Sequence, residues 1–169
     1  VYNVNSGEFA AEMKKLLALG VRVVGGCCGT SPAYIAQLSQ IAAEFSPQKI
    51  EDKNLTVISS YTHAVYFGGA PVLIGERINP TGKKRLKQAL KDGDMAYILG
   101  EAVNQAERGA HVLDVNVGLP EIDEPSVLER AVCEIQAVTD LPLQIDTSDP
   151  VAMERAMRRY NGKPLVNSV

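Results

Sequence analysis

The sequence has no tryptophan, and aromatic residues make up only 5% of its 169 residues. Glycine, by contrast, occurs 14 times. Few aromatics with many glycines and valines fit an α/β chain with tight strand-to-helix turns better than a β-sandwich. Hydrophobic residues make up 46% and charged residues 22%, which is close to the average for globular proteins. This composition excludes a long disordered or collagen-like chain.

Two further absences narrow the class of protein. No apolar run approaches the roughly 20 residues that a membrane-spanning helix needs. The formal net charge of −3 offers no basic field for nucleic acid or anionic lipid, so neither is expected as a partner. Neither end reads as a natural terminus, because no methionine or signal-peptide pattern opens the sequence and it stops just after the apolar run 164–166. We therefore expect a segment of a longer chain.

Cysteine is scarce, and two of the three cysteines, Cys27 and Cys28, are neighbours. An odd count argues against a disulfide framework and favours a reducing, cytoplasmic location. Neighbouring cysteines cannot pair without strain, but both can bind one metal ion in a flexible, glycine-rich turn. Zinc requires three or four ligands, and Cys133, His63 and His111 are poorly placed in the sequence to complete the set. This reasoning leaves two interpretations open: the two cysteines bind zinc together, or they are buried, inert thiols.

Apolar periodicity alternates between helices and short strands. Helices are predicted at 8–19, from Pro32, at 82–91, 94–109 and 125–138, and from Pro150; strands are predicted at 21–24, 72–76, 111–116, 141–146 and 164–167. Strand, loop and capped helix form the repeating unit of a parallel α/β fold. Residues 46–70 interrupt the rhythm and are predicted to be a packed interdomain linker, anchored by Tyr61, His63, Tyr66 and Phe67.

Polar side chains stand at the carboxyl ends of four predicted strands: Glu76, Asp114, Asn116, Asp146 and Asn167. Ligands bind at these ends in parallel barrels and doubly wound sheets. One such residue could simply start the next helix, although Asp149 already fills that role after Asp146. Four polar strand ends in succession predict a shared site.

Several motifs resemble known families. The segment 20–32, with its run Gly-Gly-Cys-Cys-Gly-Thr, resembles the end of the homocysteine S-methyltransferase barrel. Residues 72–82 resemble the first strand of a pterin-binding barrel, and 113–118, 144–147 and 165–168 match its next strand ends in order. Together they resemble the junction of the homocysteine and folate modules in the cobalamin-dependent methionine synthase family, over essentially the whole chain.

This resemblance implies parts of two (β/α) TIM-type barrels: the end of a homocysteine barrel at 1–45, a linker at 46–70, and the first half of a pterin-binding barrel at 71–169. The implied activity is methyl transfer from 5-methyltetrahydrofolate, via cobalamin, to zinc-bound homocysteine. Cobalamin is expected in another domain of the same or a partner chain. We expect the segment alone to bind zinc weakly and to be inactive. A bifunctional relative fused to another pterin or reductase module and a non-catalytic scaffold segment are the alternatives.

The resemblance also implies roles for individual residues. Cys27 and Cys28 would supply two thiolates to zinc, with a third cysteine lying before the sequence begins. Asp146 and Asn167 match the family's pterin-binding Asp and Asn, and Asp114 and Asn116 are expected beside them. At the mouth of the first strand we expect Glu76, Arg77 and Asn79.

Two interpretations of Arg77 carry equal weight: it lines this end of the strand, or it pairs structurally with Glu76 or Asp114. Lys83, Lys84, Arg85 and Lys87 are predicted to form a solvated helix face rather than an anion site. No residue is assigned to catalysis, because groups near the reacting pterin nitrogen come partly from later strands.

Overall fold

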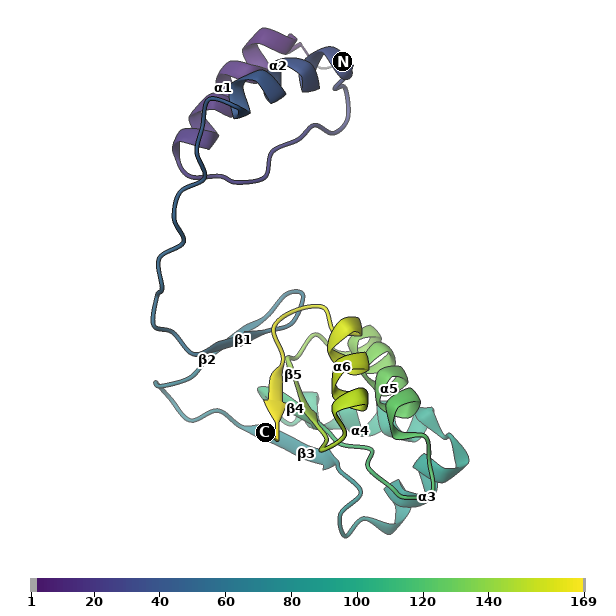
Figure 1. Ribbon diagram of the computed structural model, residues 1–169. Helices are drawn as coiled ribbons and strands as arrows, with labels where there is room; N and C mark the ends of the chain where they lie inside the picture. The colour runs from purple at the N-terminus through teal and green to yellow at the C-terminus, as the bar shows by residue number, and fades with distance from the viewer. Residues whose placement is uncertain (1–2, 169) are drawn as a thin grey trace. The chain divides into compact units, whose positions relative to one another are not determined.

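The computed structural model describes residues 3–168, which divide into a unit ending at Lys53 and a unit starting at Asn54 (Figure 1). The first unit contains α1 (Ser6–Ala18) and α2 (Pro32–Ala42). The side chain of Asn5 accepts hydrogen bonds from the backbone N–H groups of Gly7 and Glu8, so a capping box starts α1. The rings of Phe9 and Tyr34 meet edge to face at 5.6 Å, which joins the two helices.

The strand predicted at 21–24 is absent from the described part of this unit. Val23 is 89% exposed, and Val21 is exposed as well. A strand needs a neighbouring strand to satisfy its backbone N–H and C=O groups, and the described residues of the first unit include none. The apolar pattern alone was therefore not enough to predict a strand, because it does not show whether a neighbouring strand is present for pairing.

The second unit is built on a four-stranded parallel sheet. Its order is β3 (Ile74–Ile78), β4 (Val112–Val115), β5 (Leu143–Asp146) and β6 (Leu165–Asn167). The connecting helices α4 (Met95–Glu107), α5 (Glu124–Val138) and α6 (Pro150–Arg159) cover one face of the sheet, and α3 (Lys84–Asp92) precedes α4 (Figure 1). These elements confirm the predicted kinds and order in this region.

The core of the second unit lies between the sheet and these helices. Leu113 and Val115 of β4 register with Leu143 and Ile145 of β5, and all four side chains are buried. They pack with apolar residues of the helices, among them Leu86, Ile98, Leu128, Val132, Ile135 and Ala156. Because side chains alternate between the faces of a strand, the residues between these apolar ones point to the face without helices.

An antiparallel hairpin occupies part of the predicted linker. It consists of β1 (Val57–Ser59) and β2 (Ala64–Tyr66), and it belongs to the second unit. The backbones of Ser59 and Lys163 exchange hydrogen bonds of 2.9 and 3.0 Å, and the Tyr160 hydroxyl donates to the carbonyl of Ser59. The local pattern missed the hairpin, because each strand has only three residues, too few to show a period. The domain boundaries at 45 and 70 stay predictions.

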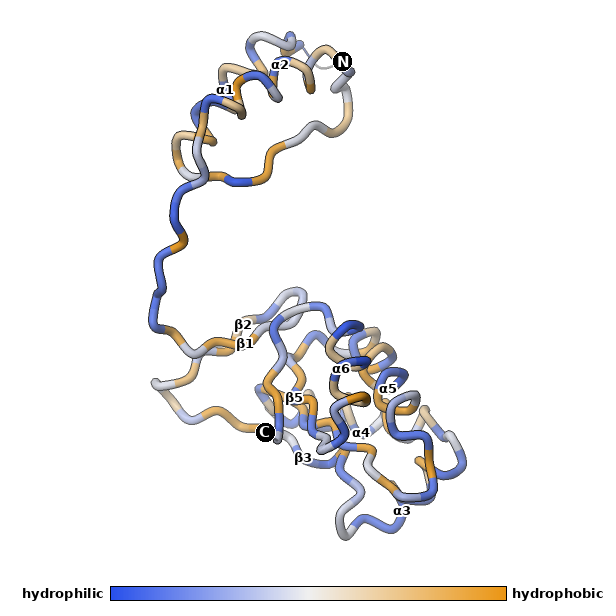
Figure 2. Tube along the Cα trace, in the orientation of Figure 1, coloured by the Kyte–Doolittle hydropathy of each residue, from blue (hydrophilic) through white to orange (hydrophobic). Residues whose placement is uncertain are grey.

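The stretch before the hairpin keeps the polar character expected of a linker. Figure 2 shows the stretch between α2 and the hairpin as largely hydrophilic, and Ile50 within this stretch is exposed. Tyr61 and Tyr66 of the hairpin region are also exposed, and their role as anchors between barrels stays a prediction. Within residues 3–168, no helix has the length and apolar character needed to cross a bilayer.

Candidate functional site

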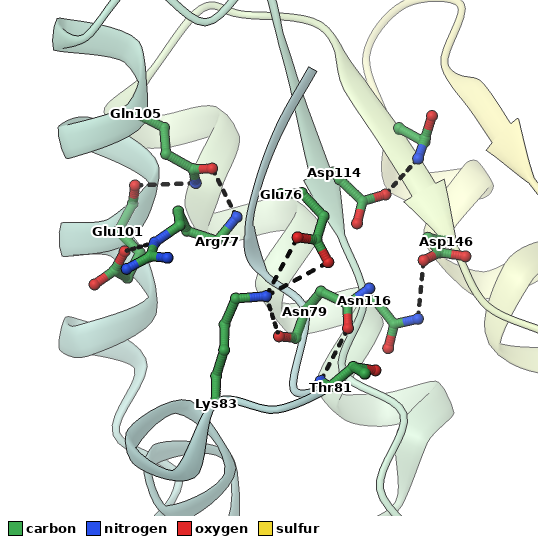
Figure 3. A network of polar contacts seen from close by, with 11 residues as sticks. Glu76, Arg77, Asn79, Thr81, Lys83, Glu101, Gln105, Asp114, Asn116 and Asp146 are labelled. Atoms are coloured by element: carbon green, nitrogen blue, oxygen red, sulfur yellow. Dashed lines mark hydrogen bonds and ion pairs between the residues drawn. The ribbon is translucent and has the colours of Figure 1, made fainter. Parts of the chain in front are cut away.

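Polar side chains form a row on the helix-free face of the sheet. Asp114 of β4 registers with Gln144 of β5, and Asp146 of β5 registers with Asn167 of β6. Asn116 directly follows β4 and reaches Asp146 (Figure 3). We call these five residues the polar row. The structure thus brings together the predicted residues Asp114, Asn116 and Asp146, and places Asn167 beside Asp146 in the sheet.

Gln144 is the member of this row that the sequence analysis missed. Its side-chain amide donates a hydrogen bond to Oδ1 of Asp114. The signal was present in the sequence, because Gln144 precedes Asp146 by two residues and the side chains of a strand alternate with period two. A polar residue two positions before a strand-end carboxylate therefore shares its face.

The Asn116 side chain is fixed at both ends. Its Nδ2 donates to Oδ2 of Asp146 at 3.0 Å, and its Oδ1 accepts from the backbone N–H of Gly118 at 2.9 Å. The second bond sets which end of the amide faces Asp146. The Asp146 carboxylate keeps further lone pairs for other donors, since a carboxylate accepts about four hydrogen bonds.

Asp114 is almost completely buried, with 2% of its surface exposed. Burial, which disfavours the charged form, raises the pKa of its carboxyl from 3.8 to about 6. The nearby charges of Asp146 and Glu76 raise the pKa further, while hydrogen bonds from Gln144 and Asn79 oppose the shift. Near pH 6 this group is therefore partly protonated and can donate a hydrogen bond as well as accept one.

The end of β3 is bulged, because Gly75 registers with Leu113 and Ile78 with Val115. Three steps along β3 thus oppose two along β4, as in a β-bulge. Glu76 lies near enough to affect Asp114, and both of its carboxylate oxygens lie 3.4 Å from Nζ of Lys83 (Figure 3).

Lys83 departs from the solvated face predicted for the basic run. Its side chain is only 23% exposed, and its Nζ also donates to the carbonyl of Asn79 at 3.0 Å. The Asn79 side chain in turn accepts from the backbone N–H of Thr81 at 3.0 Å. Lys83 therefore ties the end of β3 to the loop that leads into α3, a tertiary contact that a charge pattern does not reveal.

Arg77 contacts neither of its predicted partners. Its guanidinium lies 3.9 Å from the carboxylate of Glu101 on α4, and its backbone N–H donates to Oε1 of Gln105 at 2.7 Å (Figure 3). The predicted pairing with Glu76 or Asp114 is therefore wrong. Successive residues of a strand point to opposite faces, so Arg77 faces α4 while Glu76 lies on the side of Asp114.

A polar cavity of about 430 Å³ lies at the carboxyl ends of β4 and β5. Its lining includes Thr81, Asn116, Gly118, Glu124 and Thr147. The cavity is therefore lined by Asn116 and by the loop that follows Asp146, at the end of a parallel sheet where ligands bind in barrels and open α/β folds.

The two neighbouring cysteines lie in the first unit, on the loop between α1 and α2. Both are exposed, in contrast to the alternative of buried thiols, and their sulfur atoms are 3.8 Å apart. Thr30 holds this loop by donating its backbone N–H and its hydroxyl to the carbonyl of Cys27. Within residues 3–168, no three or more His, Cys, Asp or Glu side chains are grouped so as to hold a metal ion.

Comparisons with known proteins match both parts of the chain. Residues 75–169 match the pterin binding enzyme family, and residues 1–42 match the homocysteine S-methyltransferase family. The sequence is 29% identical over 171 residues to the methionine synthase of Mycobacterium tuberculosis, and 27% identical over 176 residues to that of Mycobacterium leprae. Each alignment covers 99% of this chain, which spans only 14% and 15% of the two relatives.

Proposed function

Because the chain belongs to the pterin binding enzyme family, which residues 75–169 match, we propose that the polar row binds the pterin ring of a folate substrate. The edge of a pterin presents a ring N–H and an exocyclic amino group side by side. A carboxylate is the complementary acceptor, since its two oxygens can take both hydrogen bonds. Asp146 is assigned this role, with Asn167 donating and accepting beside it.

One observation carries this proposal: carboxylate and amide side chains from β4, β5 and β6 converge on the helix-free face of the sheet. Asp114 and Asn116 are proposed to line the same pocket, and Glu76 its edge. We also propose that this sheet is part of a TIM-type barrel, with the first unit belonging to a second barrel. The parallel order and the helices on one face support the first statement.

For the first unit we propose that Cys27 and Cys28 contribute two thiolates to a zinc site. Zinc–sulfur bonds of about 2.3 Å in a tetrahedral site place two sulfurs about 3.8 Å apart. The observed sulfur separation of 3.8 Å fits that spacing. Zinc at this position would hold a substrate thiol as its thiolate, which is the nucleophilic form. Exposed thiols of this kind also favour a reducing, cytoplasmic environment.

The two sites together support methyl transfer from 5-methyltetrahydrofolate to homocysteine as the activity of the whole protein, giving methionine and tetrahydrofolate. Matches to a pterin-binding and a homocysteine methyltransferase family within one chain favour this pairing. Cobalamin, the proposed methyl carrier, would be bound outside these residues. The part played by the polar row is to hold the pterin and polarise it, because an amine is a poor leaving group without a hydrogen-bond donor or acid.

The test is a titration of the full-length protein with 5-methyltetrahydrofolate. Asp146→Asn should raise the dissociation constant at least about tenfold, because one ring donor then faces an amide N–H. Asp149→Asn is the matched control, since Asp149 caps α6 through the backbone N–H groups of Val151 and Ala152 and asparagine caps equally well. Equal affinities for wild type and Asp146→Asn would remove Asp146 from the site.

A further inference from the structure

The loops that follow β4 and β5 lie beside the central residues of the polar row, and two hydrogen bonds connect this part of the molecule. Asn116 opens the loop between β4 and α5, and Asp146 is followed at once by the loop between β5 and α6. Besides the bond from Asn116 to Asp146, the hydroxyl of Thr147 donates to Oε1 of Glu124. Glu124 begins α5, so this bond ties one loop to the end of the other.

Thr147 is held from three directions. Only 4% of its surface is exposed. Its backbone N–H donates to the carbonyl of Asn167 at 2.8 Å, and its hydroxyl accepts from the backbone N–H of Asp149 at 3.0 Å while donating to Glu124. The residue directly after Asp146 is thereby fixed to β6, to the start of α6 and to the start of α5.

The position of Glu124 depends on the shape of the neighbouring loop. A β-carbon at position 118 would lie 3.3 Å from Oδ1 of Asn116 and 3.5 Å from Oε2 of Glu124. A side chain at 118 would therefore crowd the Asn116 amide and lie in ordinary contact with Glu124, which shows how closely the two groups approach this glycine. The first turn of a helix also favours a negative charge, which stabilises Glu124 at the start of α5.

We propose that Glu124 and Thr147 are positioning residues for the pterin site: their hydrogen bond fixes the backbone that aims the Asp146 carboxylate and the Asn116 amide. This inference rests on the proposed function, because it assigns a role within the same site. It requires no contact between either residue and the reacting atoms. The hydrogen bond between Glu124 and Thr147 holds the Asp146 carboxylate in one orientation. Bidentate recognition of the pterin requires such a fixed orientation.

The experiment compares variants of the full-length protein by titration with 5-methyltetrahydrofolate and, separately, with tetrahydropterin, which lacks the rest of the folate. Thr147→Val keeps the shape and removes the hydroxyl, so the dissociation constants for both probes should rise about tenfold. Thr147→Ser restores the hydroxyl and should bind within about twofold of wild type.

The matched control is Thr139→Val. The Thr139 hydroxyl also accepts from the backbone N–H two residues on, that of Leu141, but it precedes β5 instead of following it. Thr139→Val should leave both dissociation constants unchanged, because the hydroxyl bond that it removes lies before β5. If Thr147→Val does not fold, Glu124→Ala takes its place and should show the same loss.

The outcomes separate the two proposals. No binding of either probe by the wild type refutes the proposed function itself. Wild-type binding with unchanged affinity in Thr147→Val and Glu124→Ala refutes the positioning role alone. An equal loss of affinity in Thr139→Val would also refute it, because the effect would then follow from stability.

Discussion

The thiol loop of the first unit and the polar row of the second differ in how their side chains are held. In the polar row, Asn116, Asp114 and Asp146 each have a side-chain hydrogen bond to a neighbouring group. The two cysteines are exposed on a loop between helices, where their sulfur atoms lie 3.8 Å from each other. The side chains of the polar row are therefore ordered by the fold, whereas the proposed thiol site would take its order from a metal and a further ligand.

The cores beneath the two sites explain this difference. All four residues of β4 are buried, and the sheet unit packs them against three helices. In the first unit, the described buried apolar residues are Ala10, Leu17 and Leu38. Because hydrophobic burial is worth about 25 cal/mol per Å², two helices with so small a core fix their connecting loop weakly.

The largest expected effect concerns the thiols. In the full-length protein, Cys27→Ser and Cys28→Ser should each abolish stoichiometric zinc binding, because zinc would lose one of about three protein thiolates. Metal analysis of the purified protein measures this. Cys133→Ser is the control and should retain zinc, since Cys133 lies on α5 in the second unit. Pterin affinity should be unchanged in all three variants, and a fall in any of them would show that the two sites are not independent.

The next effect is on stability. Leu143→Ala in β5 should lower the stability of the sheet by about 3 kcal/mol, because the side chain is fully buried and its removal leaves a cavity. Leu16→Ala on α1, where the leucine is 42% exposed, should cost less than about 1 kcal/mol. Hydrogen exchange measured on peptides from each unit locates both changes. Comparable losses in the two units would contradict the contrast between their cores.

These predictions show what the sequence alone determines. Periodicity located the four parallel strands and their helices, because the apolar residues of this core have partners across the sheet or in a covering helix. The same reasoning placed a strand at 21–24, where the described residues offer no partner. The position of Asp114, Asn116 and Asp146 at the carboxyl ends of successive strands also predicted that they lie together, as they do.

The features that the sequence did not predict depend on contacts between distant residues. Arg77 meets Glu101 of α4, and Lys83 donates to the carbonyl of Asn79 just after β3. The hairpin depends on Lys163, about a hundred residues away. The bond between Glu124 and Thr147 joins two loops, and neither loop has a pattern that indicates it.

A smaller effect follows from the raised pKa of Asp114. A pKa that rises from 3.8 to about 6 on folding means that stability is lost as pH increases through this range and stays reduced above it. Asp114→Asn should therefore stabilise the sheet by up to about 2 kcal/mol at pH 8 and by almost nothing at pH 4. Hydrogen exchange of β4 at the two pH values, corrected for intrinsic rates, measures the difference. A gain that is equal at both pH values would contradict the buried-carboxyl explanation.

The smallest effect tests the helices of the first unit. Asn5→Ala removes the side chain that accepts from Gly7 and Glu8 and should destabilise α1 by about 1 kcal/mol. Asn5→Asp is the control and should retain the cap. Exchange of the α1 amides should quicken in the alanine variant alone, without change in the sheet unit; a change in the sheet would mean that the two units are coupled.

The most direct test of the central claim is a crystal structure of the full-length protein with 5-methyltetrahydrofolate bound. The account predicts that the Asp146 carboxylate lies about 3 Å from two adjacent nitrogens of the pterin, with Asn116 and Asn167 alongside. A pterin ring bound elsewhere would contradict it, for example in the cavity of about 500 Å³ beside β3 and α4, which Arg77, Glu101 and Gln105 line.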